Sequence, residues 1–243
     1  MDIHKPKPWH GLREFLKEYV IIVVGVLTAL GAEAMVENLH EARVSDEARA
    51  AVRGEITLDV TNMKRRADLE PCIARRLSEL SDFVARAEAG QSSPPPLTIG
   101  APGHPVVQTE RWEAATAGAR TSLLSIDEQR SFAGVYEQLR SYQATKPVER
   151  EVWGQLIGLE GVRRPSPELL ARAREALGRA RLLDLHIQRS FLEISGFAER
   201  MGVKGNAKLL FAQPYLNQPI CLPLSTPPAE AARHAGGGIP LSP

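Results

Sequence analysis

The sequence predicts an all-α protein, with a membrane-spanning helix near the N-terminus followed by a helical bundle. Residues 19–36 form one apolar run that contains a single charged residue, Glu33. Downstream, apolar residues recur every three or four positions in several segments, which is the spacing that one face of an α-helix requires. No segment alternates apolar and polar residues over a sustained stretch, so we expect no β-sheet.

Composition places the chain among ordinary globular proteins. Its 243 residues are 43% hydrophobic and 24% charged, which is enough apolar material for one core. The 30 Lys and Arg residues nearly balance the 29 Asp and Glu residues. This balance leaves the molecule without a strong positive field, so we expect no nucleic-acid partner.

The apolar run is long enough to cross a bilayer. A helix over residues 19–36 measures about 27 Å, close to the roughly 30 Å of a hydrocarbon core. Its apolar side chains surround the helix, whereas a core helix of a soluble protein usually shows a polar stripe. We therefore predict a transmembrane helix over residues 19–36. The alternatives are a buried core helix and a cleaved signal peptide, with Ala32-Glu33-Ala34 as the cleavage site.

Basic residues on the two sides of the run predict its orientation. More of them precede the run than follow it closely: Lys5, Lys7, Arg13 and Lys17 come before it, Arg43 and Arg49 after it. The positive-inside rule then places residues 1–18 in the cytoplasm. No second run of comparable length follows, so we expect a single-pass protein whose remaining residues are exported, into the periplasm of a bacterium with two membranes.

The segment around the run, from Trp9 to Arg43, reads WHGLREFLKEYVIIVVGVLTALGAEAMVENLHEAR. It resembles the N-terminal signature of a family of uncharacterised proteobacterial membrane-anchored proteins of unknown function. It is also similar to the "VIGILIAL" anchor of a larger bacterial family. The resemblance is close over residues 9–43 and loose over the remainder. It implies an inner-membrane anchor followed by a helical domain, and it assigns no activity and no site residues.

Residues 37–213 are predicted to form the exported helical domain. Helical spacing covers residues 44–63, which continue the membrane helix outward with Glu55 and Asp59 among their polar residues, and residues 73–89, 110–120, 125–142, 147–159 and 166–202. Ser125 and Glu128 match a capping box, and Pro147 is expected in the first turn of a separate helix. Residues 90–105 are predicted to be a loop, and the Pro- and Gly-rich residues 214–243 a disordered tail.

The chain contains two cysteines, Cys72 and Cys221. In an oxidising compartment such a pair favours a disulfide, which would tie the tail to the start of the second helix. The alternative is two unpaired thiols. The spacing matches neither a C-x-x-C redox motif nor a zinc site.

A stripe of four residues in the N-terminal helix is a candidate interaction surface. Gly25, Ala29, Glu33 and Glu37 are spaced by four, so two small residues and two carboxylates share one side of the helix. Small residues let two helices approach closely, and a polar group in the same seam can bond to the facing helix. We expect a parallel homodimer through this stripe. Alternatively, Glu33 reaches the outer membrane interface by itself, or takes part in a proton or ion relay.

No catalytic, cofactor-binding or metal-binding motif is present, and the histidines are scattered. We therefore expect a membrane-tethered, non-catalytic interaction or scaffold protein without a cofactor, with an unidentified protein partner and a tendency to self-associate. The alternative function is a ligand-binding or sensing domain with a pocket lined by three aromatic residues, Trp112, Tyr136 and Trp153. An enzyme is the least favoured of the three classes.

Overall fold

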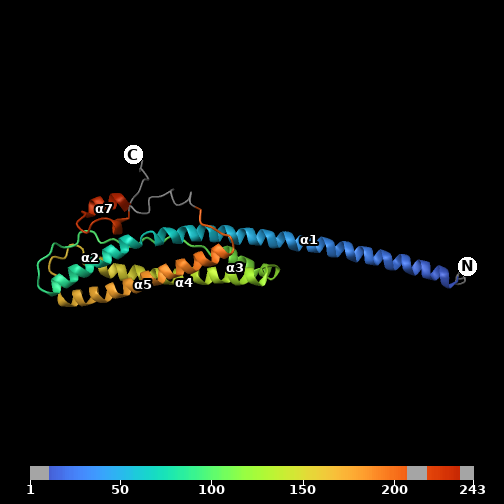
Figure 1. The fold of residues 1–243 in the computed structure, drawn as a ribbon, viewed down its shortest axis with the longest axis horizontal. Helices are drawn as coiled ribbons and strands as arrows, with labels where there is room; N and C mark the ends of the chain where they lie inside the picture. Colours follow the sequence, from blue (N-terminus) through green and yellow to red (C-terminus); the bar gives the residue numbers. More distant parts are fainter. Residues whose placement is uncertain (1–10, 207–217, 236–243) are drawn as a thin grey trace, which may run out of the picture. The chain divides into compact units, whose positions relative to one another are not determined.

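The structure is a computed structural model that describes residues 11–206 and 218–235. Within these ranges the protein is helical and has no strand, which confirms the all-α class. The α-helices, labelled in Figure 1, are α1 (Leu12–Ala67), α2 (Glu70–Glu88), α3 (Glu110–Ala117), α4 (Ile126–Ile157), α5 (Pro167–Arg200) and α7 (Pro228–Ala235). Two short 3₁₀ helices, η1 (Arg120–Leu123) and η3 (Pro219–Cys221), complete the list.

The chain divides into two compact units, residues 1–47 and residues 48–243. The described part of the first unit is helical throughout, because α1 begins at Leu12 and includes all of the apolar run. Gly25 and Gly31 do not interrupt it. Residues 1–10 of the predicted cytoplasmic segment lie outside the described residues.

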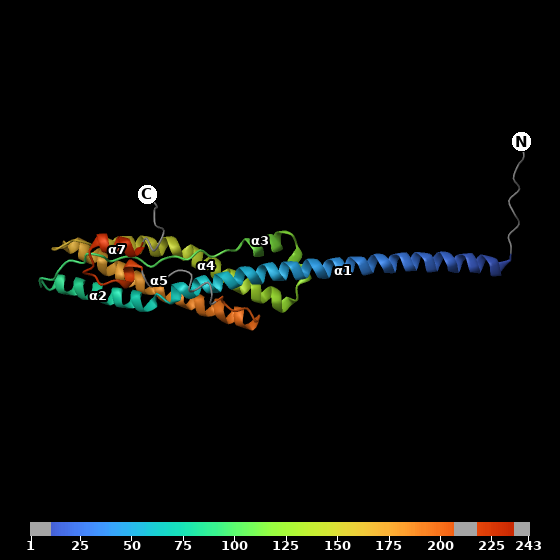
Figure 2. The same ribbon diagram turned by 90° about the horizontal axis from the view of Figure 1, so that it is seen from above.

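The second unit is a helical bundle with two apolar clusters along its length. Figure 2 shows α4 and α5 running side by side, with α2 along the same bundle. The first cluster joins α2 to the C-terminal half of α4 and the N-terminal half of α5, and includes Leu77, Trp153 and Leu177. The second joins the last turns of α1 to the opposite halves of α4 and α5, and includes Ile56, Leu139 and Ile194. This exchange of halves shows that α4 and α5 are antiparallel.

Local sequence signals mark where α2, α4 and α5 begin. Ser125 caps α4 in a capping box, with the Glu128 amide 3.3 Å from the serine hydroxyl and the glutamate carboxylate 3.2 Å from the Ser125 amide. Ser166 caps α5, with Pro167 in its first turn. Pro71 lies in the first turn of α2 and marks the predicted break after α1. These three helix starts are confirmed.

The predicted helix start at Pro147 is wrong. Pro147 lies inside α4, which continues to Ile157. Proline removes one backbone hydrogen bond and usually kinks a helix. Here Tyr142 and Thr145 before it, and Val152 after it, are buried in the bundle, so tertiary packing holds both halves of α4 in one helix.

The predicted disordered tail is wrong for residues 218–235, which form η3 and α7. Ile220 is fully buried in the first apolar cluster, and Ala231 is also buried. Long-range bonds to α2 hold this segment in place, and composition alone does not reveal such bonds. Residues 214–217 and 236–243 lie outside the described residues.

Candidate functional site

The apolar part of α1 is a surface that the chain itself does not cover. It contains a window of eighteen residues that is apolar enough to cross a membrane, and none of that window is buried. Ile21, Ile22 and Leu27 are 71%, 63% and 63% exposed. Among the described residues, α1 is the helix that has the length and composition of a membrane span. Such exposure costs about 25 cal/mol per Å² in water, so an apolar environment is the expected solvent for this segment.

The predicted stripe Gly25, Ala29, Glu33 and Glu37 lies within this exposed segment, and the structure shows all four residues exposed. A Cβ atom built on Gly25 meets no other atom within 4 Å. The hydroxyl of Thr28 donates to the carbonyl of Val24 at 2.7 Å, so the helix itself provides the hydrogen-bond acceptor for this polar group. The stripe is therefore open to a second helix.

The three candidate pocket aromatics do not line a common pocket. Trp112 of α3 stacks on Tyr136 of α4, with ring centroids 5.5 Å apart and an interplanar angle of 6°. Both belong to the second apolar cluster, whereas Trp153 belongs to the first. All three are buried. The three residues are packed as core residues. The pocket that was expected for a ligand-binding or sensing domain is therefore not formed by them.

A buried ionic cluster lies within the bundle and was not predicted from the sequence. Arg66 at the end of α1 is fully buried, and its Nη2 atom donates to Glu149 of α4 at 2.6 Å and to Asp184 of α5 at 3.0 Å. His104 from the long loop places Nδ1 3.4 Å from Glu149. Gln188 donates to the other oxygen of Asp184 at 2.6 Å. One cation thus joins three helices.

Burial sets the charge state of this cluster. Burial raises the pKa of Glu149, and the charge of Arg66 opposes that rise. Burial lowers the pKa of Arg66, but the two carboxylates more than offset this and leave it above its ordinary value. Burial and the nearby charge of Arg66 lower the pKa of His104 to about 4, so His104 is neutral at neutral pH. The arrangement fits a structural ion cluster that fixes the register of α1, α4 and α5.

A disulfide and a buried arginine fasten the C-terminal segment to α2. Cys72 and Cys221 are bonded, as predicted, across a sequence separation of 149 residues. One turn along α2, the fully buried Arg76 donates to the carbonyls of Thr98, Ile220 and Leu222. A single guanidinium therefore bonds to both the long loop and the C-terminal segment. Arg76 lies three residues after Ile73 and four before Leu80, on the apolar side of α2, whereas its neighbour Arg75 is exposed. This helical spacing is the sequence signal that could have identified it.

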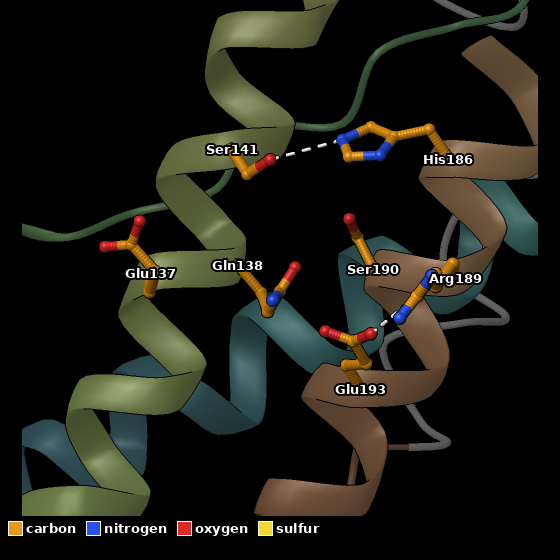
Figure 3. Close-up of a pocket in the computed structure, with 7 residues that line it drawn as sticks. All are labelled: Glu137, Gln138, Ser141, His186, Arg189, Ser190 and Glu193. Atoms are coloured by element: carbon orange, nitrogen blue, oxygen red, sulfur yellow. Dashed lines mark hydrogen bonds and ion pairs between the residues drawn. The ribbon is translucent and has the colours of Figure 1, made fainter. Parts of the chain in front are cut away.

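A shallow groove between α4 and α5 contains a serine–histidine pair (Figure 3). Its volume is about 310 Å³, and its lining includes Glu137, Ser141, His186 and Arg189. Ser141 Oγ lies 3.2 Å from His186 Nε2. The nearby backbone amides are bonded within α4 and α5, although the side chains of Gln138 and Arg189 also line the groove. Within the described residues, His186 bonds to Ser141 and has no carboxylate bonded to its other ring nitrogen. We therefore assign the pair no catalytic role.

No family model, curated protein or solved structure matches this chain.

Proposed function

We propose that this chain is a single-pass membrane protein whose helical bundle is a non-catalytic interaction or scaffold module. The observation that carries the proposal is the apolar window of α1, which the chain leaves uncovered. Its length matches a bilayer core, and every backbone group inside a helix is already bonded, as a membrane interior demands. We place the N-terminus in the cytoplasm and the bundle in the periplasm of a bacterium.

Two further observations support export of the bundle. The basic residues are concentrated before the apolar run. The Cys72–Cys221 disulfide belongs to an oxidising compartment, and it joins residues far apart in the sequence. The resemblance of residues 9–43 to bacterial membrane-anchored proteins agrees with the same topology.

Topology is tested with reporters fused to both ends of the full-length chain. A periplasm-active reporter should work only at the C-terminus, and the protein should remain in the membrane after a carbonate wash. Release into the soluble fraction would contradict the anchor. A C-terminal reporter that works only in the cytoplasm would contradict the proposed orientation.

We further propose that two copies associate through the stripe Gly25, Ala29, Glu33 and Glu37. Gly25→Leu adds a bulky side chain at the closest approach of the two helices, and should reduce the dimer at least fivefold in detergent micelles. Analytical ultracentrifugation of the full-length protein measures this change. Gly31→Leu is the matched control, because Gly31 is equally open but lies on another side of the helix. A monomeric wild type, or equal dimer for both variants, would exclude the stripe.

A further inference from the structure

Two carboxylates on α1 lie inside the bundle, although the sequence places them among the polar residues of that helix. Glu55 is 4% exposed and Asp59 is fully buried. The two residues are four apart, so they are neighbours on one side of α1. Their burial differs from what their place among the polar residues of an amphipathic helix suggests. Their hydrogen-bond partners are residues 49 to 81 positions further along the chain, which a local pattern does not reveal.

The two carboxylates hold one segment, residues 105–117, which contains the end of the long loop and α3. Asp59 Oδ1 accepts the amide N–H of Gln108 at 2.9 Å, and Glu55 Oε2 accepts that of Arg111 at 3.0 Å. Thr109, the N-cap residue of α3, makes no capping bond with its own side chain. Glu55, a residue of α1, therefore acts as the N-cap of α3, because its carboxylate accepts the hydrogen bond that an N-cap side chain would otherwise accept. It lies at the N-terminal end of α3, where the helix dipole favours negative charge.

The second oxygen of Asp59, Oδ2, is buried and has no hydrogen-bond partner in the described structure. An unpartnered charge in such a site is costly, whereas a neutral carboxylic acid is tolerated much better. The fully buried Asp59 and the nearly buried Glu55 thus lie beside each other without a cation bonded to either oxygen of Asp59. The geometry favours a proton on Asp59.

The ionisable groups around Asp59 mostly oppose its charge. Glu55 on α1 and Glu110 on α3 are repulsive, while Lys146 on α4 is attractive and donates to the carbonyl of Pro105 at 2.8 Å. Tyr136 on α4 donates to Glu55 at 2.6 Å. Burial, opposed by the bond from Gln108 and reinforced by the two glutamates, raises the pKa of Asp59 from 3.8 to about 7.

We propose that Glu55 and Asp59 form a proton-operated latch, in which a proton bound by Asp59 holds the 105–117 segment on α1 and its loss loosens that segment. This inference is independent of the membrane topology. When the segment detaches, Asp59 meets water and regains an ordinary acidity. Protonation therefore favours the attached state, and attachment weakens as the pH rises from the free value of Asp59 toward its attached value.

The test is hydrogen exchange of the full-length protein in detergent, followed by mass spectrometry between about pH 5 and pH 8.5 and corrected for intrinsic exchange rates. Protection of residues 105–117 should fall about tenfold per pH unit up to about pH 7 and then level off. Residues 167–180 of α5 serve as the internal reference, whose protection should follow no such profile. Asp59→Asn mimics the neutral acid and should give protection that no longer changes with pH.

Two further variants separate the latch from a general effect of pH. Glu55→Gln removes one repulsive neighbour and should move the transition to lower pH, which gives a readout that does not depend on Asp59→Asn folding. Asp82→Asn changes an exposed carboxylate on α2 and should keep the wild-type profile. Constant protection in the wild type, or an unchanged profile in Asp59→Asn or Glu55→Gln, would overturn the proposal.

Discussion

Replacing Arg66 with methionine is expected to lower the free energy of unfolding by about 3 to 5 kcal/mol. Arg66 is the cation bonded to Glu149 and Asp184, and both the guanidinium and Glu149 are fully buried. Methionine keeps much of the volume but leaves two carboxylates in the bundle without their counter-charge. Urea denaturation of wild type and variant, followed by the helical signal in circular dichroism, measures the difference.

Two variants show whether the loss comes from the buried charges. Arg189→Met removes an exposed arginine that pairs with Glu193 on the surface of α5, and should change stability by less than about 0.5 kcal/mol. The triple variant Arg66→Met, Glu149→Met and Asp184→Leu removes the whole cluster, and should recover most of the lost stability. A loss below about 1 kcal/mol for Arg66→Met would contradict the proposed importance of the cluster.

The elements that the sequence predicts well depend on local information. The serine caps at Ser125 and Ser166 and the proline at Pro71 each act within one helical turn of the chain, and the structure places helix starts at all three. The apolar run of α1 is likewise visible from composition alone. Local rules suffice where the decisive interactions lie within a few residues.

The buried charges are the part that local rules miss. Charged side chains are seldom fully buried unless they are paired, so the pattern assigns them to the surface by default. The bond partners of Arg66 lie 83 and 118 residues away, and those of Glu55 and Asp59 lie on the long loop, α3 and α4. The predicted helix start at Pro147 is wrong for the same reason. Packing against residues far away in the sequence outweighs the preference of proline for the first turn of a helix.

The candidate functional residues also divide into those that a local pattern identifies and those that depend on long-range contacts. The stripe from Gly25 to Glu37 is a local pattern whose four residues are exposed, and its role in association stays a prediction. The aromatic pocket needed residues of α3 and of two distant turns of α4 to lie close together. Periodicity alone could not show that Trp153 belongs to a different cluster from Trp112. The predicted disulfide is confirmed, and it could be predicted because two cysteines allow a single pairing.

The double variant Cys72→Ser and Cys221→Ser is expected to lower the free energy of unfolding by up to about 5 kcal/mol. The bond closes a loop of 149 residues, and the entropy that such a loop removes from the unfolded chain grows with its length. Denatured-state structure reduces the full value, so a loss of about 2 to 5 kcal/mol is the expected range. Urea denaturation with and without reductant measures it.

The same double variant separates the covalent tie from the bonds of Arg76. The guanidinium still holds the carbonyls of Ile220 and Leu222, so residues 218–226 should stay attached in the native state and keep most of their protection against hydrogen exchange. Reductant should destabilise the wild type and leave the double variant unchanged. Equal stability of the two proteins would contradict the entropic contribution of the bond. Full exchange of residues 218–226 in the variant would instead show that the disulfide, rather than Arg76, determines where the C-terminal segment lies.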